Sequence, residues 1–156
     1  GIPRNDIFFN KALHEHIRKG VVEQYNLPAN GRIVLYAPTF RSSGSIEPYR
    51  IDWQDIIPRL ERMFGGVKVT LLLRLHPNLI GKVDTSSLMN HPSVIDVTRY
   101  HDMQELLCVS DMLITDYSSS MFDYAILRRP CMLYATDVAQ YDRGYYYDFS
   151  RCIYYS

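Results

Sequence analysis

The alternation of apolar and polar positions along the chain predicts helices and strands in a regular order. Residues 1–31 carry apolar side chains near a 3.6-residue spacing, interrupted by Gly20 and closed by turn-forming pairs, which predicts a helical lead-in. A short apolar run at 32–38 ends in proline and is typical of a strand buried on both faces of a parallel sheet. The polar stretch 42–49 then predicts an exposed loop.

The remaining pattern repeats a unit of strand and helix. Residues 53–64 have helical spacing and stop at a Gly-Gly pair, and helices are also predicted at 102–109, with Asp102 as N-cap, and at 118–127. Further strands are predicted at 67–75, 93–97, 112–115 and 131–134. This order predicts an α/β fold, a Rossmann-like open parallel sheet flanked by helices on both faces.

The chain has the length of one compact domain. Its 156 residues, 47% of them hydrophobic, suffice for a single core over 1–156, with the parallel α/β core at 32–134. The segment 135–156 is rich in tyrosine. Its rings could cover the sheet edge with their hydroxyls in water, pack against a neighbouring lobe, or form an amphipathic edge at a membrane surface.

Charge and cysteine usage narrow the classes of partner. Seventeen basic residues balance seventeen acidic ones, so no overall field favours nucleic acid, and an anionic ligand must be held locally. No apolar run reaches the roughly 18 residues of a membrane span, and three scattered cysteines predict neither a disulfide scaffold nor a zinc site. We therefore expect a cytoplasmic, soluble segment with no nucleic-acid partner.

The chemistry-bearing residues follow the predicted strands. Ligands of such sheets bind outside the carboxyl ends of the strands, where the loops of neighbouring strands meet. Polar side chains occupy these positions after four strands: Pro38, Thr39 and Arg41; Arg74 and His76; Thr98; and Asp116 with Ser118, Ser119 and Ser120. We expect these groups to converge on one ligand.

The three serines predict an anion site. A strand end that runs into a helix start places free backbone amides, hydroxyls and the positive end of the helix dipole around one point. Arg41 and Arg74 follow neighbouring strands and could add charge-assisted hydrogen bonds to a phosphate. The alternative is that one serine merely caps the helix, which would leave the other two unexplained.

His76 and two aspartates are the other candidates. Pro77 restricts His76 to an extended backbone at the ligand edge, where its ring could bind a phosphate oxygen or transfer a proton. Asp123 could accept hydrogen bonds from ribose hydroxyls. Asp116 could contact the nucleotide, or instead hold its loop by bonding backbone amides, and both interpretations are open.

Several chemistries lack their residues. The sequence contains no GxxxxGK[ST], GxGxxG or His/Cys/Asp cluster, which disfavours Walker-type ATP binding, a dinucleotide site and two-metal phosphoryl transfer. We expect neither a bound metal nor a cofactor other than the substrate.

Five segments in series resemble the CDP-glycerol glycerophosphotransferase family. They are GIPRND at 1–6, LYAPTFR at 35–41, RLHP at 74–77, SDMLITDYSSSMFD at 110–123 and YDRGY at 141–145. The resemblance implies a two-lobed GT-B architecture, of which this chain is the C-terminal, donor-binding lobe. It implies CDP-glycerol or CDP-ribitol as donor and a polyol-phosphate or lipid-linked acceptor bound by the other, absent lobe.

The resemblance also implies roles for individual residues. His76 matches a histidine thought to act at the donor phosphates, Arg74 and Ser118–Ser120 would hold the pyrophosphate, and the region of Thr98 would lie near the base and ribose. Pro38, Thr39, Asp116 and Asp123 are assigned to the nucleotide. An acceptor hydroxyl would attack the β-phosphorus and release CMP without a required metal, in a protein peripheral on the inner membrane face.

Two other functions are compatible with the residues. A GT-B glycosyltransferase that takes a nucleotide sugar would need the same anion site. A non-catalytic nucleotide-binding or assembly module could use the tyrosine-rich end to engage a partner or a membrane. The polar strand ends alone do not separate these readings.

Overall fold

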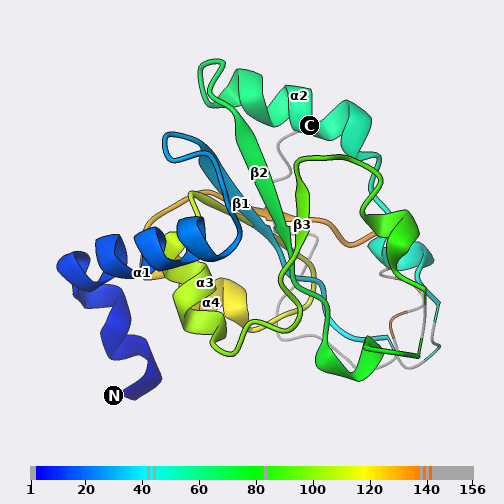
Figure 1. Ribbon diagram of the computed structural model, residues 1–156. Coiled ribbons are helices and arrows are strands. Elements are labelled where there is room, and N and C mark those ends of the chain that lie inside the picture. Colours follow the sequence, from blue (N-terminus) through cyan, green and yellow to red (C-terminus); the bar gives the residue numbers. More distant parts are fainter. Residues whose placement is uncertain are drawn as a thin grey trace.

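The computed structural model describes residues 3–141 except 42, 44, 83, 138 and 140. Within this part of the chain, five parallel strands form one open sheet in the order β3-β2-β1-β4-β5 (Figure 1). The strands are β1 (Arg32–Tyr36), β2 (Val69–Leu73), β3 (Val94–Asp96), β4 (Met112–Thr115) and β5 (Cys131–Leu133). The predicted Rossmann-like sheet and each of its five strands are confirmed.

Four α-helices accompany the sheet in the described residues. They are α1 (Lys11–Gln24), α2 (Trp53–Met63), α3 (Met103–Val109) and α4 (Ser120–Ala125), with short 3-10 turns η1 (Pro3–Phe9), η2 (Glu47–Tyr49), η3 (Pro77–Leu79) and η4 (Ser86–Leu88). The interruption expected at Gly20 is wrong, because α1 runs through it. A Cβ at position 20 would contact no other atom, so no close packing requires glycine there. Gly20 weakens the helix only through the larger backbone entropy that glycine loses on folding.

Local sequence explains where the helices begin and end. The Asp102 carboxylate accepts hydrogen bonds from the amides of Gln104 and Glu105, which confirms it as the N-cap of α3. Helix α2 ends at Met63 and is followed closely by Gly65 and Gly66, whose φ angles of +72° and +83° few other residues adopt. No helix in the described ranges is both long and apolar enough to cross a bilayer.

Two hydrophobic layers cover the sheet, one on each face. In β1, Ile33 and Leu35 join a core with α1, α3 and Tyr124 of α4, whereas Val34 and Tyr36 join a second core with α2. This alternation is the two-residue period of a strand, and Figure 1 shows α1, α3 and α4 grouped apart from α2. The central strands β1, β2 and β4 are therefore buried on both faces, as their apolar runs predict, whereas the edge strands β3 and β5 are only partly buried.

The strand order locates the ligand edge of the sheet. From β1 the chain proceeds to β2 and β3 on one side and returns to β4 and β5 on the other side. The strands β1 and β4 are adjacent, but the chain leaves them in opposite directions, toward β2 and toward β5. This reversal of strand order is a topological switch point. The loop after β1 begins with residues 37–41, and the loop after β4 consists of residues 116–119, directly before α4.

Candidate functional site

A cavity of about 510 Å³ opens at this switch point. Its lining brings together seven of the residues predicted from the sequence: Pro38, Thr39, Arg74, His76, Ser118, Ser119 and Ser120. Among the described residues that line it, none carries a carboxylate. The cavity wall therefore combines one guanidinium, one imidazole and three serine hydroxyls, which together suit an anion.

The serines form a tight turn between β4 and α4. The hydroxyl oxygens of Ser118 and Ser120 lie 2.8 Å apart, and the Ser118 oxygen also accepts the backbone amide of Ser120 at 3.2 Å. Helix α4 consequently starts at Ser120, two residues later than predicted. Ser119 at the N-cap makes no capping bond with its side chain and is exposed at the cavity.

His76 has the extended backbone that Pro77 predicts, with φ −68° and ψ 135°. Its Nδ1 accepts the backbone amide of Asn78 at 3.2 Å. A neutral ring with Nδ1 as acceptor carries its proton on Nε2, so Nε2–H is the donor available to a ligand. The ring lies 5.4 Å from that of Phe40, which restricts its orientation at the cavity.

Arg74 supplies the positive charge of the cavity. Its Nη1 donates to the carbonyl oxygens of Tyr100 and Val97. The pKa of Arg74 is lowered, because burial lowers it more than the nearby Asp102 carboxylate raises it. Within the described residues it forms no ion pair, so its charge is not neutralised by direct contact with a carboxylate.

Arg41 lies outside the cavity lining, although the sequence assigned it to the donor phosphate. Its side chain is only 6% exposed, with Nη2 2.8 Å from Asp116 and Nε 2.7 Å from Asp137. Burial alone would lower the pKa of Arg41, but hydrogen bonds and charges from Asp137 and Asp116 outweigh burial and raise it. The structure thus separates Arg41 from Arg74.

Asp116 points into the protein. It accepts the backbone amide and hydroxyl of Thr39 at 2.8 and 2.6 Å, and the amide of Tyr117 at 2.6 Å. Of the two interpretations left open, these contacts support the one in which Asp116 holds the loops. Thr39 itself lines the cavity, so Asp116 fixes the wall rather than facing the ligand.

Thr98 and Asp123 are not brought to this cavity. Thr98 lines a neighbouring hollow of about 200 Å³, and its hydroxyl accepts the amide of Leu75, a residue that both hollows share. Asp123 accepts a hydrogen bond from the Asn5 side chain at 2.8 Å and so connects α4 to η1. Their nucleotide-binding roles stay predictions.

Almost the whole chain matches the profile of a known protein family. The profile described as CDP-Glycerol:Poly(glycerophosphate) glycerophosphotransferase matches residues 1–154. The chain belongs to this family. It is 38% identical over 146 residues to the teichoic acid poly(glycerol phosphate) polymerase of Staphylococcus epidermidis, covering 92% of this chain and 20% of that protein. It is 35% identical to the teichoic acid ribitol-phosphate primase of Bacillus spizizenii, covering 96% and 38%.

Solved structures of the glycerophosphotransferase family share the fold. The wall teichoic acid polymerase TagF matches with a TM-score of 0.71 and 36% identity, over 97% of this chain and 36% of that one. A histidine-to-asparagine variant of TagF, soaked with CDPG for 30 minutes, matches with a TM-score of 0.65 and 38% identity over 92% and 33%. This chain therefore spans between a fifth and two fifths of the length of these relatives.

Two tyrosines of the cavity were missed by the sequence reasoning. Tyr117 and Tyr141 stack with ring centroids 3.8 Å apart and an interplanar angle of 15°, and both line the cavity. Each lies within a segment that resembles the family, which was the available signal. The other tyrosines of 142–156 lie outside the described residues.

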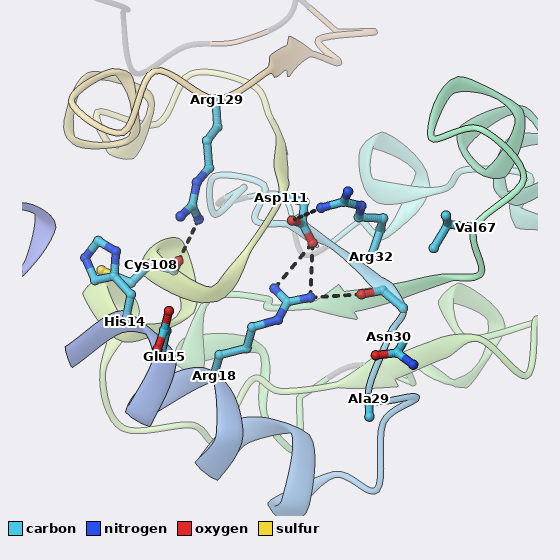
Figure 2. Close-up of a pocket in the computed structure, with 11 residues that line it drawn as sticks. His14, Glu15, Arg18, Ala29, Asn30, Arg32, Val67, Cys108, Asp111 and Arg129 are labelled. Carbon is cyan, nitrogen blue, oxygen red and sulfur yellow. Dashed lines mark hydrogen bonds and ion pairs between the residues drawn. The ribbon is translucent and has the colours of Figure 1, made fainter. Parts of the chain in front are cut away.

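A second hollow of about 440 Å³ lies at the opposite, amino-terminal edge of the sheet (Figure 2). Asp111 is central to it and pairs with Arg18 and Arg32 at 3.3 and 3.1 Å. Arg129 donates to the carbonyl oxygens of Cys108 and Ser110 at the end of α3. These contacts connect α1, β1, α3 and the start of β4, so the charges there already have structural partners.

The described residues contain no group of three His, Cys, Asp or Glu side chains that could hold a metal ion. The expectation of chemistry without a metal stays a prediction. Cys108 is buried, which raises the pKa of its thiol to about 11, so the thiol is protonated near neutral pH.

Proposed function

We propose that this chain is the donor-binding lobe of a transferase of polyol phosphate. The donor would be CDP-glycerol, or the similar CDP-ribitol, and the acceptor a growing polyol-phosphate chain such as teichoic acid. One observation carries the proposal: the cavity at the switch point joins Arg74, the Nε2 side of His76 and the serine turn, with no carboxylate in its described lining.

The size and charge of the cavity suit a diphosphate rather than a neutral sugar alone. About 510 Å³ lies within the range of roughly 300–1,000 Å³ for ligand sites, enough for part of a nucleotide. A diphosphate needs positively charged hydrogen-bond donors that are not already paired with a carboxylate. Arg74 meets this requirement, because its Nη1 donates to backbone carbonyl oxygens. Pro38 and Phe40 add apolar surface beside the charged part.

In the proposed reaction an acceptor hydroxyl forms a bond to the β-phosphorus of the donor. The bond from that phosphorus to the oxygen bridging it to the α-phosphorus breaks, and CMP leaves with that oxygen. Arg74 and the serine turn would neutralise the charge on the phosphoryl oxygens, and His76 Nε2–H would donate to one of them. The acceptor's proton would pass to a base elsewhere in the protein.

The remaining parts of the proposal concern the longer protein. A second lobe would bind a polyol-phosphate or lipid-linked acceptor and complete a GT-B cleft. The protein would act in the cytoplasm, peripheral on the inner face of the membrane where such an acceptor is anchored. The lengths of the teichoic acid relatives, two and a half to five times this chain, are compatible with such a lobe.

Calorimetric titration tests the donor. The protein that carries this chain is titrated with CDP-glycerol, CDP-ribitol, a UDP-sugar and a CMP-sugar under the same conditions. We expect the CDP-polyols to bind most tightly. A clear preference for the uridine donor would instead assign the chain to a nucleotide-sugar glycosyltransferase.

The transferase activity is tested by CMP release. His76→Ala in the longer protein should abolish turnover while the fold is kept, as judged by its circular dichroism. Unchanged turnover together with lost membrane association would favour the non-catalytic assembly module.

A further inference from the structure

The segment that follows β5 returns to the cavity at the carboxyl end of the sheet. Tyr134 donates its backbone amide to the Thr115 carbonyl at 2.7 Å, and its hydroxyl donates to the Arg50 carbonyl at 3.0 Å. Further along, Asp137 reaches Arg41, and Tyr141 lines the cavity. The described residues between 134 and 141 are therefore tied to the loop after β1.

Arg41 is the centre of this connection. Nε and Nη2 donate to the two oxygens of Asp137 at 2.7 and 3.0 Å, Nη2 also contacts Asp116 at 2.8 Å, and Nη1 donates to the Thr39 carbonyl at 2.6 Å. All three guanidinium nitrogens are thus engaged with protein oxygens, a bidentate arrangement that lysine cannot reproduce. A phosphate could reach Arg41 only after these contacts were broken.

The contacts extend from Arg41 to the cavity wall. The Tyr117 hydroxyl donates to Asp137 at 2.9 Å, and the Tyr117 ring stacks on Tyr141. The Arg41 guanidinium carbon lies 4.8 Å and 5.0 Å from the centroids of these two rings, which are themselves 3.8 Å apart. The Arg41 guanidinium therefore packs against both rings of the stacked pair.

We infer that Arg41 is a positioning residue of the donor site: through Asp137 it holds Tyr141 and the stacked Tyr117 in place as one wall of the cavity. The inference rests on the proposed donor function. Tyr117 directly precedes Ser118, so the same brace also sets the position of the serine turn. Arg41 acts on the donor through these side chains and not by direct contact with its phosphates.

A double-mutant cycle on donor affinity separates positioning from direct contact. CDP-glycerol is titrated into the protein that carries this chain and into Arg41→Met, Tyr141→Leu and the double variant. We expect each single substitution to raise the dissociation constant by roughly tenfold and the double variant to add little to either. Multiplicative effects would show that Arg41 and Tyr141 act independently and would overturn the inference.

Asp137→Ala provides a second variant that keeps the Arg41 charge and its Asp116 contact. We expect this variant to weaken CDP-glycerol binding by a factor similar to Arg41→Met, because the brace to the segment is lost in both. Binding equal to that of the unaltered protein would contradict the brace. Arg18→Met is the control, since Arg18 is partly buried and paired with an aspartate but lies at the opposite edge.

Hydrogen exchange tests the brace without any donor. Arg41→Met and Asp137→Ala should increase amide exchange in residues 134–141, whereas Arg18→Met should leave it unchanged. Unaltered exchange in both brace variants would overturn the inference even if the donor is not CDP-glycerol. Absence of CDP-glycerol binding by the unaltered protein, with increased exchange in these variants, would overturn the proposed function alone.

Discussion

Asp116 Oδ1 accepts two hydrogen bonds from Thr39, one from its backbone amide at 2.8 Å and one from its hydroxyl at 2.6 Å. This contact joins the loops after β1 and β4, which the strand order makes diverge. The fully buried carboxylate of Asp116 therefore holds Thr39, which lines the switch-point cavity, at a fixed distance from the loop after β4.

Replacing Asp116 by Asn should destabilise the fold. The substitution leaves the Arg41 charge buried with one carboxylate in place of two, and it places an amide NH2 donor where Oδ2 contacts the Arg41 guanidinium, while Oδ1 can still accept from Thr39. Breaking a buried pair costs several kcal/mol, so we expect a loss of about 3 kcal/mol in the free energy of unfolding. Urea denaturation measures this loss.

The same change in an exposed ion pair is the control. Asp55→Asn breaks the pair with Arg59 on the surface of α2, where both side chains are more than half exposed. A loss below about 0.5 kcal/mol is expected there. Equal losses in the two variants would contradict the structural role assigned to Asp116.

Asp137 should add an acid-sensitive contribution to stability. Hydrogen bonds from Arg41, followed by those from Tyr117, hold the pKa of Asp137 below its ordinary value of 3.8 despite its partial burial. A carboxyl group with a lowered pKa in the folded state stabilises the fold above its unfolded pKa. That stability is lost as the pH falls from near 4 through the lowered folded pKa.

Urea unfolding between pH 2 and pH 6 measures the effect as a slope. Asp137→Asn should be less stable than the unaltered protein at pH 6, and the difference should shrink as the pH falls below about 4. A difference that does not change with pH would exclude an electrostatic origin.

Arg74 should recognise the phosphates of the donor and not its nucleoside. Hydrogen bonds to charged groups contribute about 1.5–3 kcal/mol, so Arg74→Met should weaken CDP-glycerol binding by roughly ten- to a hundredfold. Cytidine, which lacks phosphate, should bind both proteins alike. Arg59→Met on the exposed face of α2 is the control. Equal losses of affinity for cytidine and CDP-glycerol would show that Arg74 does not recognise the phosphates.

The two ring nitrogens of His76 should differ in function. Nδ1 is occupied by the Asn78 amide, so the donor to the ligand is Nε2–H. Glutamine places an amide nitrogen near the position of Nε2, whereas asparagine places one near Nδ1. His76→Gln should therefore retain more CDP-glycerol affinity than His76→Asn, by about tenfold in calorimetry. The reverse order would assign the contact to Nδ1.

Much of the fold can be predicted from the sequence because the signals for its helices and strands are local. Strand period, N-caps such as Asp102 and the stop at Gly65-Gly66 depend on residues within a few positions of each other, and each was confirmed. The polar strand ends also predicted a cavity at the carboxyl edge, since parallel strands bring these ends together. Local signals failed at Gly20, where packing of α1 on α3 outweighs a weak helix former.

Only the tertiary structure decided which site residues face the cavity and which hold its wall in place. Arg41 and Arg74 both follow a buried strand, and the sequence by itself assigned both to phosphate. They differ because Arg41 meets Asp137, 96 residues away along the chain, whereas Arg74 meets backbone carbonyl oxygens at the cavity. Which partner a guanidinium meets depends on how distant segments pack, and packing also turned Asp116 inward while leaving His76 and the serine turn at the cavity.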